Sequence, residues 1–247
     1  MGEVRVRFLG SGDAFGSGGR FQTCFYVRSG ATHLLVDCGA SSLVAMKRFG
    51  VDPSVVDAIL ISHLHGDHFG GVPFFIMYSN YVARRRKPLT IAGPPGLKTR
   101  VLEAMEVLFQ GSSRMDLEFG IDFVELPEES NTGVSSLTVT PYGVVHPSGA
   151  PAYAFRISLD GKILAYSGDT EWTEALIPVA RGVDLFVCEC THFENASGAH
   201  LDYRTLMDHR AELECDRIIL THMNEDMLRR IGNLGVEGAE DGGTVIL

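Results

Sequence analysis

The sequence has no apolar run close to the roughly 20 residues that a membrane-spanning helix requires. Its first residues, Met1-Gly2-Glu3-Val4-Arg5-Val6, lack the charged and then apolar pattern of a secretory signal. Its five cysteines are an odd number, and their spacing matches neither a zinc knuckle nor a disulfide framework. Reduced thiols are typical of cytosolic proteins. We therefore expect a cytoplasmic protein that has no membrane partner.

Positive charge is also scarce. The 21 Lys and Arg residues face 31 Asp and Glu residues, which gives a formal net charge of -10. This balance argues against broad binding to a nucleic-acid backbone. The one dense basic run, Arg84-Arg85-Arg86-Lys87, is typical of a solvated loop or helix end. Hydrophobic residues make up 45% of the 247 residues, enough for a sizeable core, and one domain over residues 1–247 is the default at this length.

Segments with strand and helix patterns alternate along the chain. Strands are expected at 4–8, 23–27, 34–36, 58–61, 89–91, 137–140, 154–157, 163–166, 185–188, 218–220 and 244–247. Helices are expected from a Ser41 or Ser42 cap to residue 49, and at 72–82, 94–109, 173–180 and 203–214. Both halves of the chain are rich in strands. The pattern predicts an α/β fold in which two sheets pack face to face with helices outside, an αββα sandwich.

The densest chemical signal is the run His63-Leu64-His65-Gly66-Asp67-His68. The chain has only 9 histidines, so three of them within one short run need a cause. The run leaves the end of a buried strand at 58–61 and precedes Gly70-Gly71, which is a usual setting for a functional loop. Neutral imidazoles and an ionised carboxylate are ligands for Zn²⁺ and similar ions. We interpret the run as part of a metal site; a histidine-rich polar turn is the alternative.

Three more candidate ligands stand at the ends of predicted strands, namely His146, Asp169 and His222. Each alone would be an ordinary cap or surface group. Together with the histidine-rich run they make seven candidate ligands at the same kind of position. Ligand types do not separate Zn²⁺ from Mn²⁺ or Fe.

The order His-x-His-x-Asp-His, His, Asp, His resembles the metallo-β-lactamase superfamily over nearly the whole chain. The resemblance implies two divalent metal ions, with zinc expected, that hold a bridging hydroxide as the nucleophile. It implies that these ions are held by His63, His65 and His146, by Asp67, His68 and His222, and by Asp169 as the shared bridge.

Several features exclude particular branches of the superfamily. The di-iron members that reduce oxygen or nitric oxide resemble His-x-Glu-x-Asp-His, with Glu where this chain has His65, so the run does not match them. Zinc β-lactamases commonly have Cys where this chain has Asp169, so antibiotic hydrolysis is disfavoured. The stretch between Asp169 and His222 is too short for the large insert of the nucleic-acid-processing β-CASP branch.

The segments 187–192 and 198–203 resemble tRNase Z and the cyclic phosphodiesterase of phosphonate degradation. The segments 8–12 and 35–39 also resemble this branch. In it, a histidine at the position of His200 protonates the leaving oxygen, and Glu189 is the candidate to orient it. General acid help of this kind is typically worth about 10²–10⁴-fold. The alternative for His200 is a helix cap or surface histidine, and Asp37 is equally consistent with support for a ligand histidine or with a plain turn cap.

The chain also departs from tRNase Z. Cys188 stands where tRNase Z enzymes often have a further His, and the stretch between His146 and Asp169 has no room for the arm that grips tRNA. The sequence therefore predicts a binuclear metal-dependent phosphodiesterase on a small or cyclic phosphodiester, with Asp67, His200 and Glu189 as its catalytic set. Large nucleic acids are disfavoured, and a homodimer is expected from base rates.

Three alternatives to this function remain at the level of sequence. One is a carboxyl-ester, thioester or lactone hydrolase that uses the same metals. The others are a tRNA 3′-processing endonuclease and a non-catalytic member that binds a ligand at the site.

Overall fold

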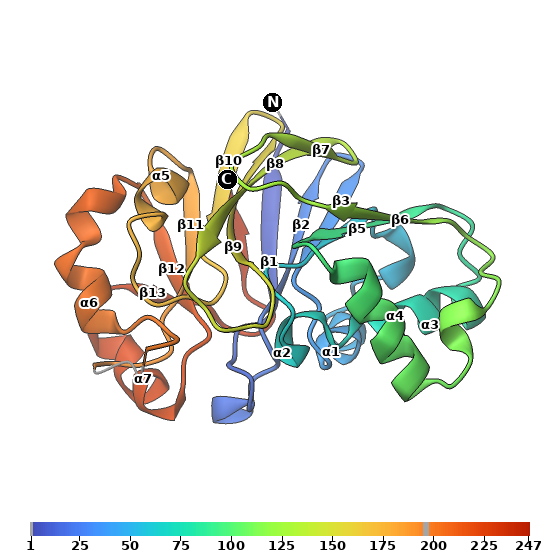
Figure 1. Cartoon of the computed structure of the whole chain (residues 1–247). Helices are drawn as coiled ribbons and strands as arrows, with labels where there is room; N and C mark the ends of the chain where they lie inside the picture. The colour runs from blue at the N-terminus through green and yellow to red at the C-terminus, as the bar shows by residue number, and fades with distance from the viewer. Residues whose placement is uncertain (1, 195–197) are drawn as a thin grey trace.

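Two seven-stranded sheets face each other, with helices on their outer sides (Figure 1). The structure, a computed structural model, describes residues 2–194 and 198–247. The expected αββα sandwich is confirmed by this arrangement. Within the described residues, no helix has the length and apolar character needed to cross a membrane.

The first sheet is antiparallel on one side and parallel on the other. Its antiparallel part joins β14, β1, β2 and β3, and its parallel part joins β3, β4, β5 and β6. In sheet order the strands are β14 (Thr244–Ile246), β1 (Val4–Gly10), β2 (Cys24–Ser29), β3 (Thr32–Val36), β4 (Ala58–Leu60), β5 (Leu89–Gly93) and β6 (Ile121–Glu125).

The second sheet is also parallel on one side and antiparallel on the other. Its parallel part joins β13, β12, β11 and β10, and its antiparallel part joins β10, β9, β8 and β7. In sheet order the strands are β13 (Glu237–Gly238), β12 (Ile218–Thr221), β11 (Leu185–Glu189), β10 (Lys162–Tyr166), β9 (Ala152–Leu159), β8 (Leu137–Val144) and β7 (Thr132–Val134).

Helices cover the outer face of each sheet through separate apolar clusters. Those on the first sheet are α1 (Ser42–Arg48), α3 (Val72–Tyr81) and α4 (Leu97–Leu108), with the short α2 (Gly66–Phe69) beside them. Those on the second sheet are α5 (Leu176–Ala180), α6 (Tyr203–Asp208) and α7 (Glu225–Arg230). Short 3₁₀ turns are η1 (Ser17–Gly19), η2 (Pro53–Val55), η3 (Ser112–Arg114), η4 (Arg210–Leu213) and η5 (Ile231–Asn233).

The central core lies between the two sheets. Period-2 alternation turns Val4, Val6 and Phe8 of β1 into it. Phe25 of β2 meets Tyr166 of β10 across the interface, with ring centroids 5.0 Å apart. Both rings are fully buried. Burying apolar area of this kind is the main force that holds the sheets together.

The strand and helix predictions hold for most elements, and the differences have local causes. Ser41 occupies the N-cap position of α1, but its hydroxyl accepts the Gln22 amide at 2.9 Å instead of capping the helix. The predicted helix 203–214 ends at Asp208, and the chain continues as a 3₁₀ turn. Strands β6, β7 and β13 were not predicted; β6 and β13 have no fully buried residue, so they lack a clean apolar pattern.

The loops that follow β3, β4, β10, β11 and β12 meet at one edge of the sandwich. At this edge the chain must turn sharply. Gly168, directly after β10, has φ +59°, and a Cβ there would lie 2.4 Å from the Tyr153 carbonyl oxygen. Only glycine fits both the backbone angle and the close approach.

We expect Gly168→Ala to destabilise the fold more than Gly182→Ala. Gly182 has φ +66° but open space around the Cβ position. Both variants meet the left-handed backbone penalty of about 1–2 kcal/mol, and only Gly168→Ala adds the clash with Tyr153. Urea denaturation followed by circular dichroism measures the difference. Equal losses of unfolding free energy would show that the close approach is not limiting.

Candidate metal centre

The loops at this edge bring all seven predicted ligands into one cluster. The possible ligand atoms of His63, His65 and His146 lie within 4.8 Å of one another. The same limit holds for a second group that consists of Asp67, His68, Asp169 and His222. The first group has the members of one predicted set, and the second combines the other predicted set with Asp169. The side chains come from both sheets, so the centre forms only when the sandwich is closed.

The Asp169 carboxylate lies at the middle of the cluster. Its Oδ2 atom is 3.3 Å from Nε2 of both His68 and His222, and 3.8 Å from Nε2 of His63. The distance to Nε2 of His146 is 4.0 Å. One oxygen therefore faces ligand atoms of both groups.

Three side-chain atoms of the cluster have no hydrogen-bond partner in the residues that the structure describes. They are His63 Nε2, His68 Nε2 and Asp169 Oδ1, and all three are buried. Buried polar atoms of this kind normally have a partner. A divalent cation would satisfy an imidazole lone pair and a carboxylate oxygen together, so the residues present fit a metal.

A buried carboxylate orients one ligand from behind. Asp37 follows β3 and accepts four hydrogen bonds. Ser62 donates two of them, from its amide and its hydroxyl, each at 2.8 Å. Tyr166 donates from its hydroxyl at 2.9 Å, and His68 donates from Nδ1 at 2.7 Å. The last bond leaves His68 Nε2 to face the cluster, so Asp37 supports a ligand histidine as well as the turn.

Two other ligand histidines are fixed in the same way. His146 Nδ1 donates to the Ala199 carbonyl oxygen at 2.7 Å. His222 Nδ1 lies 2.9 Å from the Thr191 hydroxyl, which itself donates to Glu189 Oε2 at 2.8 Å. In each ring Nε2 faces the cluster. Such outer hydrogen bonds set the tautomer and the ring orientation of a ligand histidine.

The electrostatics of the cluster favour a cation. Burial and the neighbouring His68 hold the pKa of His63 well below its ordinary value, which keeps this imidazole neutral and able to coordinate. Burial acts to lower the pKa of His222, but the Asp169 and Asp67 carboxylates raise it to about 9. The carboxylates therefore attract positive charge into a buried site, which is what a metal ion supplies.

His200 lies beside the ligands and is more open than they are. Its side chain is 24% exposed, against 2% for Asp169. Its Nδ1 donates to Glu189 Oε1 at 3.0 Å, and its ring stacks on His222 with centroids 5.2 Å apart. Glu189 is fully buried at the end of β11 and also accepts the Thr170 amide at 2.6 Å. The predicted pairing of Glu189 with His200 is thus present in the structure.

Sequence reasoning missed some of the supporting residues. Thr191 joins His222 to Glu189, while Ser62 and Tyr166 hold Asp37. The signal for Ser62 and Thr191 was their position at strand ends: Ser62 directly precedes the predicted ligand His63, and Thr191 lies two residues after the predicted catalytic Glu189. Tyr166 had no such signal, because it reads as one more apolar residue of a buried strand. Cys188, which stands where tRNase Z enzymes often have a further His, is a fully buried thiol in the apolar cluster under α5 and α6.

Comparison with known proteins identifies the family to which this chain belongs. The family described as Anti-Pycsar protein Apyc1 matches residues 4–239. The chain belongs to this family. The match runs from β1 to the end of the last parallel strand, so it includes every residue of the candidate metal centre.

Apyc1-family and neighbouring proteins resemble the chain over most of its length. It is 27% identical to an Anti-Pycsar protein Apyc1 of Bacillus phage 010DV004, over 91% of this chain and 90% of the relative. It is 30% identical to a Ribonuclease Z of Mycobacterium bovis, over 74% of this chain and 69% of the relative. The metallo-β-lactamase fold protein YhfI from Bacillus subtilis superposes with a TM-score of 0.77 at 19% identity, over 98% and 99% of the two chains.

These likenesses confirm the superfamily and the branch that the motifs indicated. They also agree with the centre just described, because its His and Asp donors fit divalent metal ions. The Apyc1-family chain is therefore an enzyme, a hydrolase with the metallo-β-lactamase fold.

Asp37→Asn should weaken metal binding about 10–100-fold, because His68 would lose the charge that fixes its tautomer. Tyr166→Phe removes one donor to Asp37 and should have a smaller effect in the same direction. Asp122→Asn on the exposed strand β6 removes the same charge elsewhere and is the control. Titration against a competing chelator measures the affinity. Equal affinity in the Asp37 and Asp122 variants would contradict this role.

Proposed function

We propose that the protein is a binuclear metal-dependent phosphodiesterase that acts on a small or cyclic phosphodiester. The observation that carries the proposal is the hydrogen-bonded pair of His200 and Glu189 beside the ligand cluster. A cluster of ligands alone suits many hydrolases. A partly exposed histidine held by a buried carboxylate adds a proton donor at the place where a leaving group would depart.

In this proposal His63, His65 and His146 hold one ion, and Asp67, His68 and His222 hold the other, with Asp169 between them. Zinc is the expected ion, with manganese or iron as alternatives. When bound, such ions act as Lewis acids on the phosphoryl oxygens and lower the pKa of coordinated water. The distances around Asp169 Oδ2 support its place as the shared ligand.

The proposed role of His200 follows from its contacts. Burial acts to lower its pKa, but the hydrogen bond and the charge of Glu189 raise it above the ordinary value. The imidazole therefore stays protonated to higher pH than a free imidazole does. Glu189 holds the Nδ1 side, so the Nε2 side is the one that can give a proton to a departing alkoxide. Thr170 and Thr191 hold Glu189 in turn, which makes them positioning residues.

Three features favour a small substrate. The cavity beside His200 has a volume of about 220 Å³, and Trp172 is among the residues that line it. Two acids, Glu171 and Asp202, also line it and would repel a long phosphate backbone. Strands β8 and β9 follow each other closely, so no gripping arm extends from the sheet between them.

Cleavage of tRNA 3′ ends is the second candidate, because a relative of similar sequence is named Ribonuclease Z. The acidic cavity and the net charge of -10 weigh against it. Ester, thioester or lactone hydrolysis and a non-catalytic binding role are separated from the proposal by substrate tests. A homodimer, a cytoplasmic location and a single domain over residues 1–247 stay predictions.

The purified protein should contain about two metal ions per chain by elemental analysis. It should hydrolyse bis(p-nitrophenyl) phosphate or a cyclic nucleotide in preference to a lactone, a thioester or a tRNA precursor. Asp169→Ala should abolish turnover, because it removes the carboxylate shared by both ligand groups. Less than one ion per chain, or full activity in this variant, would refute the binuclear assignment.

His200→Ala should reduce turnover of a phosphodiester with an alkyl leaving group by about 10²–10⁴-fold. It should change p-nitrophenolate release far less, because nitrophenolate leaves without a proton. Glu189→Gln keeps the size of the side chain and should show the same bias in weaker form. Each variant is its own control, since both substrates use the same metals. Equal losses on the two substrates would contradict the proton-donor role.

A further inference from the structure

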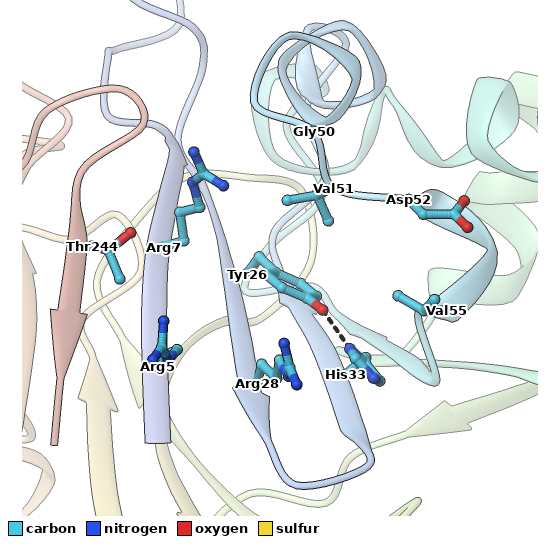
Figure 2. A pocket seen from close by; sticks show the side chains of 10 residues that line it. All are labelled: Arg5, Arg7, Tyr26, Arg28, His33, Gly50, Val51, Asp52, Val55 and Thr244. Carbon is cyan, nitrogen blue, oxygen red and sulfur yellow. Dashed lines mark hydrogen bonds between the residues drawn. The ribbon is translucent and has the colours of Figure 1, made fainter. Parts of the chain in front are cut away.

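A second cavity lies on the outer face of the first sheet, away from the metal centre (Figure 2). Its volume is about 340 Å³, within the usual range for small-molecule sites. Strands β1 and β2 form its floor, and the segment from α1 to η2 forms one wall. The metal centre is at the other end of these strands, beyond Gly10 of β1 and Val36 of β3.

Three arginines project into this cavity because of strand alternation and register. Arg5 and Arg7 lie on the face of β1 opposite to the one that packs in the core. On the neighbouring strand, Arg28 lies directly opposite Arg5, and Tyr26 lies directly opposite Arg7. Like charges placed directly opposite across a pair of strands are unfavourable. The chain thus brings positive charge together here although its net charge is -10.

The protein itself neutralises little of this charge. Arg5 pairs with Glu3, but both side chains are half exposed. Neither Arg7 nor Arg28 forms an ion pair within the residues that the structure describes, and the buried Nε of Arg7 lacks a hydrogen-bond partner there. Asp52 is the one acid among the described lining residues, and it is occupied by the Ser54 amide and hydroxyl at 2.9 and 2.6 Å.

The rest of the cavity is aromatic and aliphatic. The Tyr26 ring stands at its centre, and its hydroxyl is hydrogen-bonded to His33 Nδ1 (Figure 2). Val51 and Val55 face the ring from the wall. Burial lowers the pKa of His33, so this imidazole is a neutral partner that holds Tyr26 in place. A planar or apolar group would therefore find a fixed surface next to the arginines.

We propose that this cavity is a binding site for a small phosphomonoester of the size of a mononucleotide. The three guanidinium groups bind the phosphate dianion through paired N–H donors, which is the geometry that arginine offers. The organic part of the ligand packs against Tyr26, Val51 and Val55. A phosphomonoester carries about two negative charges near neutral pH, so the arginines favour it over a diester with one. The site shares no residue with the metal centre and does not depend on the proposed hydrolysis.

Calorimetric titration of the metal-loaded protein with 5′-AMP, inorganic phosphate and adenosine tests this site. Arg28→Gln is the main variant, since Arg28 is exposed and its loss should leave the fold intact. Arg7→Gln is the second variant, checked by its melting temperature. Arg86→Gln is the matched control, because Arg86 is an exposed arginine outside the cavity.

We expect 5′-AMP to bind about tenfold or more weakly to Arg28→Gln and Arg7→Gln than to the wild type, as expected for the loss of a charge-assisted hydrogen bond. Arg86→Gln should bind as the wild type does. Phosphate should bind more weakly than 5′-AMP, and adenosine should bind weakest. Binding at the metals is common to all variants, so it cannot produce this difference.

Equal affinity of Arg28→Gln and Arg86→Gln for 5′-AMP, or adenosine binding as tight as 5′-AMP, would overturn the proposal. Hydrolysis is not part of the readout, so a failure here is separate from a failure of the proposed function.

Discussion

Five imidazoles and two carboxylates share one buried edge of the sandwich, and much of the local structure serves to keep them there. Their inward atoms would repel or remain unsatisfied without a cation, as the orphaned atoms of His63, His68 and Asp169 show. The outward atoms, in contrast, are bound to Asp37, Thr191 and the Ala199 carbonyl. The fold therefore fixes the rings of His68, His146 and His222 from behind and leaves their inward nitrogen atoms for the ion.

The two sheets have the same division into parallel and antiparallel parts, and this division brings the ligands of both sheets to one edge. Parallel strands send their carboxyl ends to one edge, and both sheets send theirs to the same edge. His63 and Asp67 leave the first sheet, while Asp169 and His222 leave the second. The shared core of Phe25 and Tyr166 lies directly beneath. The same tyrosine donates to Asp37, so packing of the core and orientation of a ligand are linked in one side chain.

Much of this could be predicted from the sequence, because the relevant signals are local. The run from His63 to His68 is recognisable as a metal-binding motif, and His146, Asp169 and His222 each follow a recognisable strand. The supporting residues are harder to find. Tyr166 looks like core until the sheets are brought together, and the partner of His146 is a backbone oxygen that no residue type reveals. The cluster of Arg5, Arg7 and Arg28 likewise depends on strand register, which the sequence alone did not provide.

The bond from His146 to the Ala199 carbonyl has a consequence for comparing and redesigning these enzymes. The contact uses the backbone, so the side chain at position 199 is free to differ between relatives. The carbonyl oxygen at this position can still accept the hydrogen bond from His146. An alignment that ranks positions by identity would overlook it. A loop grafted into this region could carry almost any sequence there, but its backbone would have to return to the same place, next to His200, or a ligand would lose its anchor.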